Sequence, residues 1–181
     1  MTAGIPSPRT DDEPMAFTAD EFLRGTVASW LAFNALFAVS LAVMSLITPA
    51  SGWGSPWAAV AMLAIYVVPI SLLVSGVVTL LCCGAAWALG RRLRRTPSLL
   101  PHVIGYAVLG ALIGLLVVGG YQLVVTQRLD LGGWFALLVL ACSAAALPLG
   151  WSRAVRRARR ADAGLIRPAR VDPDAAAEDA L

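Results

Sequence analysis

The stretch TVASWLAFNALFAVSLAVMSLI, from Thr26 to Ile47, decides the fold class of this chain. It contains no Asp, Glu, Lys, Arg or His, and it is longer than the roughly 20 apolar residues that cross the hydrocarbon core of a bilayer. Just before it, Thr18 to Glu21 read T-A-D-E, a capping-box pattern that starts a helix. Thr48-Pro49 ends the helix, because the residue before proline avoids the helical region. The sequence therefore predicts a transmembrane helix here.

Three further uncharged runs follow the first one. In the second run, Trp57 and Trp87 are about 45 Å apart along a helix, which matches a bilayer with its head-group zones. This run is therefore predicted to be one helix, with a kink at Pro69. The four predicted spans are 26–47, 57–89, 102–126 and 133–151. We expect an all-α integral membrane protein with four antiparallel transmembrane helices and short loops.

The composition agrees with a membrane protein. Hydrophobic residues make up 59% of the 181 residues and charged residues only 14%, whereas soluble domains carry about 25% charged residues. Residues 17–166 are predicted to be the four-helix domain, including a basic helical extension over 152–166. Residues 1–16 are predicted to be a disordered cytoplasmic tail, and residues 167–181 a disordered acidic tail.

The arginines predict the orientation. All 14 basic residues are arginine, and thirteen of them lie in the N-terminal segment, the 91–101 loop and the C-terminal segment, with only Arg128 on the other side. Basic residues in short loops favour the cytoplasm, so both termini are predicted to be cytoplasmic. The use of arginine without lysine, together with abundant alanine, is typical of a GC-rich bacterial genome. We therefore expect a multi-pass protein of a bacterial plasma (inner) membrane.

The arginine clusters are also candidate contacts to anionic head groups of the inner leaflet, each contributing about 1 kcal/mol. The candidates are Arg91, Arg92, Arg94, Arg95, Arg153, Arg156, Arg157 and Arg160. The last four share one helical face opposite an apolar stripe. This segment is either an amphipathic helix on the leaflet or a solvated continuation of the fourth span. A five-residue cluster at a helix end is no folded basic surface, so no nucleic-acid partner is expected.

Polar and small residues in the spans indicate helix contacts. Asn34 is a candidate interhelical polar contact because lipid offers it no hydrogen bond, although a ligand or ion contact is the alternative. Gly110 and Gly114 form a G-x-x-x-G pattern that lets helix backbones approach closely, either within one chain or between chains. A further ridge of small residues consists of Ser71, Ser75 and Thr79.

No catalytic, cofactor or metal site is predicted. The four spans contain no Asp, Glu, Lys or Arg, and the only histidine, His102, cannot supply paired haem ligands. No metalloprotease or serine-nucleophile motif occurs. Cys82, Cys83 and Cys142 lie in apolar segments and are predicted to pack as small hydrophobes.

Three functions are consistent with this pattern. The first is an accessory, scaffold or assembly subunit without a catalytic site, which binds another membrane protein or a second copy of itself. The alternative is an oligomeric channel or transporter component whose pore is lined by Asn34 and Ser/Thr groups. The third, ranked last, is an enzyme acting on lipid, for which only the arginines and His102 are available as reactive groups.

Overall fold

The computed structural model describes residues 8–47, 55–129 and 131–165, and within these ranges the chain is helical without a strand. Four helices are long and apolar enough to cross a membrane, which confirms the predicted all-α fold class with four candidate spans. They are α1 (Ala19–Ile47), the continuous run of α2 (Pro56–Met62), η1 (Leu63–Val67) and α3 (Val68–Leu93), the run of α4 (Leu99–Tyr121) and η2 (Gln122–Thr126), and α5 (Trp134–Asp162).

Local capping explains where the first two of these helices begin. The Thr18 N–H donates to Glu21 Oε2 at 3.2 Å, and the Glu21 N–H donates to Thr18 Oγ1 at 3.2 Å. This reciprocal pair confirms the capping box and satisfies two N–H groups that have no partner within the helix. At the start of α2, Ser55 Oγ accepts from the Ala58 N–H at 3.2 Å, and Pro56 occupies the first turn, where its missing N–H costs nothing.

The second candidate span is one continuous helix of 38 residues, as the distance between its tryptophans predicts. Within it, η1 is a π-turn in which the Val68 N–H donates to the Leu63 carbonyl, five residues back. Pro69 follows directly, and a proline removes an N–H and crowds the preceding turn. π-Turns occur where a helix accommodates such an interruption. The irregularity expected at Pro69 therefore takes the form of a π-turn.

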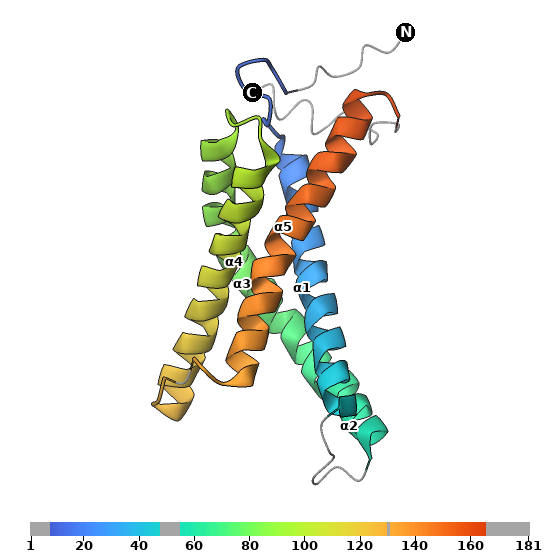
Figure 1. Cartoon of the computed structure of the whole chain (residues 1–181), viewed down its shortest axis with the longest axis vertical. Coiled ribbons are helices and arrows are strands. Elements are labelled where there is room, and N and C mark those ends of the chain that lie inside the picture. Colours follow the sequence, from blue (N-terminus) through green and yellow to red (C-terminus); the bar gives the residue numbers. More distant parts are fainter. Residues whose placement is uncertain (1–7, 48–54, 130, 166–181) are drawn as a thin grey trace.

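Helix α5 is the centre of the packing. It lies between α1 and α4 (Figure 1), and its contacts with these two helices are more extensive than those of any other helix pair. α3 passes behind them, from beside α4 at one end of the molecule to beside α1 at the other. In the most apolar stretch of the second span no residue is buried, so α3 is the least enclosed helix. The buried hydrophobic cluster consists of Phe37, Leu41, Val118, Ala136, Val139 and Cys142.

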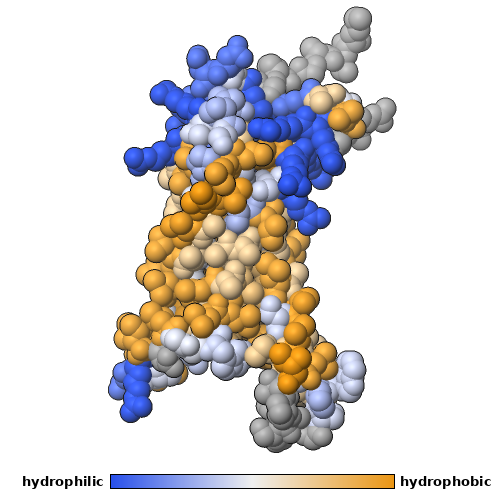
Figure 2. Space-filling view, viewed as in Figure 1, coloured by the Kyte–Doolittle hydropathy of each residue, from blue (hydrophilic) through white to orange (hydrophobic). Residues whose placement is uncertain are grey.

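An apolar band separates two hydrophilic ends (Figure 2). We call one of them the basic end: it holds residues 8–18, the α3–α4 connection and the last turns of α5. The Met15 N–H donates to the Arg94 carbonyl at 3.0 Å, and Arg9 pairs with Asp162 at 2.8 Å, which ties these three segments together. The opposite end carries Arg128, which follows η2.

Candidate functional site

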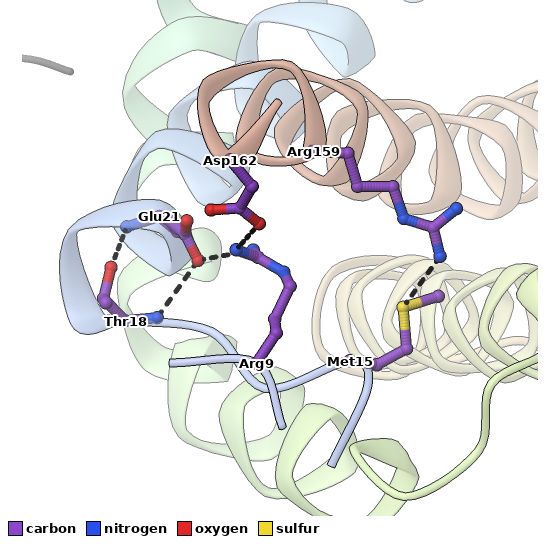
Figure 3. Close-up of polar contacts among 6 residues, drawn as sticks. All are labelled: Arg9, Met15, Thr18, Glu21, Arg159 and Asp162. Atoms are coloured by element: carbon purple, nitrogen blue, oxygen red, sulfur yellow. Dashed lines mark hydrogen bonds and ion pairs between the residues drawn. The ribbon is translucent and has the colours of Figure 1, made fainter. Parts of the chain in front are cut away.

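The segment 8–18, here called the N-terminal strap, lies across the basic end. Arg9 Nη2 pairs with Glu21 Oε2 of α1 at 2.9 Å, and Arg9 Nη1 pairs with Asp162 Oδ2 of α5 at 2.8 Å (Figure 3). The Arg9 side chain is only 14% exposed, so solvent screens these ion pairs less than it screens surface pairs. The strap therefore links the first and last helices.

Residues 8–16 of the tail predicted over 1–16 contact the helices, whereas residues 1–7 and the tail predicted over 167–181 lie outside the described residues. Met15 is 5% exposed, and Arg159 Nη2 donates to its Sδ at 3.4 Å (Figure 3). Phe17 packs edge-on against Trp87 of α3, with ring centroids 5.0 Å apart. Met15 and Phe17 are thus apolar contact residues within a polar segment, and Arg159 and Trp87, which they contact, are distant from them in sequence.

The candidate lipid-contacting arginines fall into two groups. Arg94 Nε pairs with Glu13 Oε1 at 3.0 Å, and Arg95 Nε lies 3.9 Å from the same oxygen. These two arginines thus have a partner within the chain, in the strap. The other candidates are exposed at the basic end: Arg91, Arg92, Arg153, Arg156, Arg157 and Arg160.

The basic segment after residue 151 continues α5 without a break as far as Asp162. Its apolar stripe contacts protein: Ala154 lies against Gly25 of α1, and Ala158 is 6% exposed. The helix ends where Gly164 takes a left-handed φ of 70° and the Leu165 N–H donates back to the Arg160 carbonyl, a glycine-based helix ending. The segment therefore continues the helix of the fourth candidate span, which is one of the two alternatives that the sequence left open.

Asn34 lies at the centre of a hydrogen-bonded cluster between α1 and α3. Its Nδ2 donates to the Trp30 carbonyl and to Ser75 Oγ, both at 2.9 Å, and its Oδ1 accepts from Ser71 Oγ at 3.1 Å. Trp30 Nε1 donates to the same Ser75 Oγ at 3.0 Å. Asn34 is 7% exposed. The serine ridge thus supplies the partners of Asn34, and the cluster satisfies its own polar groups.

Gly110 and Gly114 lie against α5 of the same chain. A Cβ at Gly110 would overlap the Ser143 carbonyl oxygen and lie 2.8 Å from the Ser143 carbonyl carbon. A Cβ at Gly114 would lie 3.0 Å from Ser143 Oγ. Both glycines are buried. Their close approach is therefore made between α4 and α5, within one chain.

Sequence reasoning missed the corresponding contact between α1 and α5. A Cβ at Gly150 would overlap Ser29, lying 2.6 Å from its Cα. Ser29 Oγ donates to the Gly25 carbonyl at 3.0 Å and to the Leu147 carbonyl at 3.3 Å. The sequence does contain a pattern that is typical of close helix pairs, namely two small residues four positions apart. On α1 these residues are Gly25 and Ser29, and on α5 they are Gly150 and Ala154.

His102 is enclosed near the basic end. The side chain is 1% exposed, and its ring stacks on Trp151 of α5 with centroids 4.7 Å apart. Nδ1 lies 3.0 Å from the Ser98 carbonyl oxygen, and Nε2 has no hydrogen-bond partner among the described residues. The Tyr106 ring, one turn further along α4, also lies close to Trp151, with centroids 5.6 Å apart. The ring therefore packs between α4 and α5.

A cavity of about 810 Å³ lies between α1, α3, α4 and α5. Its walls are mainly apolar, and all four helices contribute to them. Representative lining residues are Phe33, Phe37, Val74, Val78, Ile113, Val117, Phe135 and Val139. Met15 and Phe17 of the strap line it at the basic end, whereas Thr126 and Arg128 line it at the opposite end. Sequence reasoning missed this cavity, because its walls come from four separate helices.

The cysteines do not pair with one another. Cys82 and Cys83 are half-buried, Cys142 is buried, and all three are free thiols. Within the described ranges, no three His, Cys, Asp or Glu residues come together as a metal ion requires.

Comparisons with models of protein families, with curated proteins and with solved structures gave no match to this chain. By its described residues, the chain is an all-helical protein with four candidate transmembrane spans.

Proposed function

We propose that this chain is a multi-pass protein of a bacterial plasma membrane, with four antiparallel transmembrane helices and both termini in the cytoplasm. The uneven distribution of arginine supports this orientation. The exposed arginines of the last turn of α3, of the α3–α4 connection and of the C-terminal part of α5 lie at the basic end, whereas Arg128 follows η2 at the opposite end. Arginine in short connections favours the cytoplasmic side.

Cysteine labelling tests the orientation. Gln127→Cys and Thr96→Cys lie at the two ends of the α4–η2 helix. In intact cells, a membrane-impermeant maleimide is expected to label Gln127→Cys and to reach Thr96→Cys only after permeabilisation. The wild-type protein, whose cysteines lie within the helices, is the background control. Labelling of Thr96→Cys in intact cells would reverse the proposed orientation.

We propose further that the chain is an accessory, scaffold or assembly subunit, and that the outer face of α3 binds its partner. The observation that carries this proposal is the weak enclosure of α3, in whose most apolar stretch no residue is buried. Leu73, Leu80 and Leu81 are 73%, 74% and 79% exposed, and none of them lines the cavity. Helices associate in membranes through packing faces, and this face has no neighbour within the described chain.

Purification from the native membrane in mild detergent, followed by native mass spectrometry, tests this function. A second protein in fixed stoichiometry is expected. The double variant Leu80→Ala/Leu81→Ala is expected to lose it, whereas Leu116→Ala on α4, a position that is also 74% exposed, is expected to retain it. A monomer or homo-oligomer without a second protein would contradict the accessory role, and flux assays in liposomes would follow.

The contacts of Asn34 support the accessory role over a channel. A pore lined by Asn34 and Ser/Thr groups needs those groups to face a water-filled path. In this chain Asn34 does not line the cavity between the helices, and its side chain is hydrogen-bonded to Ser71 and Ser75. The cavity wall on which these two serines lie is mainly apolar. The enclosure of His102 likewise gives no support to an enzyme that acts on lipid through this ring.

A further inference from the structure

The cavity between α1, α3, α4 and α5 has the size of a site for a small ligand. Its volume of about 810 Å³ lies within the roughly 300–1,000 Å³ that is usual for ligand pockets.

The cavity walls match hydrocarbon. Phe33, Val78 and Val117, from three different helices, are typical of the lining. Trp30, Ser71 and Ser75 lie on the wall, and all three are hydrogen-bonded within the Asn34 cluster. The other small hydroxyl groups away from the two ends, those of Ser29, Thr79 and Ser143, donate to backbone carbonyls. Since these groups are already satisfied, the middle of the cavity does not require a polar ligand.

The two ends of the cavity differ. At the basic end the N-terminal strap covers it, held there by the ion pairs of Arg9 and by buried Met15. There α3 and α4 are also in contact, since a Cβ added at Gly105 would lie 3.4–3.7 Å from the side chains of Leu89 and Leu93. Toward the opposite end α3 and α4 diverge (Figure 1), and the lining residues Thr126 and Arg128 are exposed there.

A cationic group stands at that more open end. Arg128 lines the cavity there together with Thr126, and the arginine is exposed. A guanidinium forms strong, charge-assisted hydrogen bonds to phosphate. The lining arginine at the basic end, Arg9, is paired with Glu21 and Asp162. Arg128, by contrast, is exposed. An apolar chamber with an exposed arginine at its more open end fits a ligand that has hydrocarbon chains and one anionic head.

We propose that this cavity binds an anionic phospholipid of the surrounding bilayer, with its acyl chains between α3 and α4 and its phosphate at Arg128. The lipid enters sideways from the leaflet at the Arg128 end, because the strap covers the basic end. This site is separate from the outer face of α3, to which we assign the protein partner.

Binding is tested on the purified full chain after delipidation, by native mass spectrometry with added phosphatidylglycerol or phosphatidylcholine. Ile113→Trp and Val117→Trp fill the cavity from α4, and each is expected to lower phosphatidylglycerol binding about tenfold, since overfilling a packed site is costly. Leu112→Trp and Leu116→Trp are the matched controls: they are adjacent in sequence and exposed, outside the cavity lining. These controls are expected to bind like the wild type.

Arg128→Gln tests the position of the head group. This variant is expected to lose a preference of about fivefold for phosphatidylglycerol over phosphatidylcholine, because one arginine near an anionic head contributes that much. Only variants that match the wild type in size-exclusion profile and helical content are compared, and the two tryptophan pairs provide independent readings. Equal binding by cavity variants and controls would overturn the site, and an unchanged lipid preference in Arg128→Gln would overturn the placement of the phosphate.

Discussion

Replacing Gly110 with alanine tests how tightly α4 and α5 are packed. The added Cβ would overlap the Ser143 carbonyl oxygen and lie 2.8 Å from the Ser143 carbonyl carbon and 3.1 Å from Ala144 Cα. All three are backbone atoms of α5, so no side chain can rotate away to make room. The two helices must separate locally, and contacts along their shared interface are lost.

Two opposing effects set the magnitude. Glycine to alanine in a helix interior gains about 0.5–1 kcal/mol when the site is open, whereas overpacking a close contact costs about 1–3 kcal/mol. The free energy of unfolding of Gly110→Ala is therefore expected to fall by about 1–2 kcal/mol. Gly114→Ala is expected to lose less, because its nearest neighbours are side-chain atoms of Ser143 at 3.0 and 3.2 Å. Gly120→Ala meets no atom within 4 Å and is expected to be as stable as the wild type, or more so.

The assay is SDS-induced unfolding of the purified protein in mild detergent, followed by far-UV circular dichroism. Because the same glycine-to-alanine change is made at three positions of α4, differences in stability between the variants report packing rather than helix propensity. Stability is expected to increase in the order Gly110→Ala, Gly114→Ala, Gly120→Ala. If Gly110→Ala unfolds at the same SDS fraction as Gly120→Ala, the close approach of α4 to Ser143 is wrong.

Three further predictions concern the other contacts. Asn34→Leu and Ser75→Ala are expected to show a coupling energy of about 0.6 kcal/mol in a double-mutant cycle of SDS unfolding, and additive effects would mean that the two side chains do not interact. Arg9→Gln removes both ion pairs of the strap, so limited proteolysis is expected to cut the N-terminal segment faster than in the wild type; unchanged cleavage would contradict the strap. Gly150→Ala is expected to lower the SDS midpoint at least as much as Gly110→Ala does, because its Cβ would overlap the backbone nitrogen of Ser29; a wild-type midpoint would argue against that contact.

The start of α1 illustrates a feature that local sequence predicts well. Thr18 and Glu21 cap the helix through groups three residues apart, so the signal and the structure lie in the same short stretch. The strap immediately before them was not predicted. Met15 and Arg9 are held by Arg94, Arg159 and Asp162, and none of these residues is close to the strap in sequence.

The candidate contacts follow the same distinction. The sequence alone indicates that Asn34 needs a hydrogen-bond partner in an apolar span and that Gly110 and Gly114 present a surface for close packing. It does not indicate that Asn34 meets Ser71 and Ser75, because any of the remaining spans could lie beside α1. The cavity is still less accessible to sequence reasoning, since its residues are ordinary core residues on each helix taken singly.

Local sequence patterns were sufficient to predict the number and helical nature of the four candidate spans. Charge-free runs and helix capping are local properties, and a backbone in an apolar setting must satisfy its own hydrogen bonds. The tertiary structure alone decided that α5 lies between α1 and α4, that the strap covers the basic end, and that α3 stands apart far enough to leave a cavity. Those features depend on how small residues such as Gly150 and Ser29 meet across helices, and a one-dimensional pattern does not specify which faces will pair.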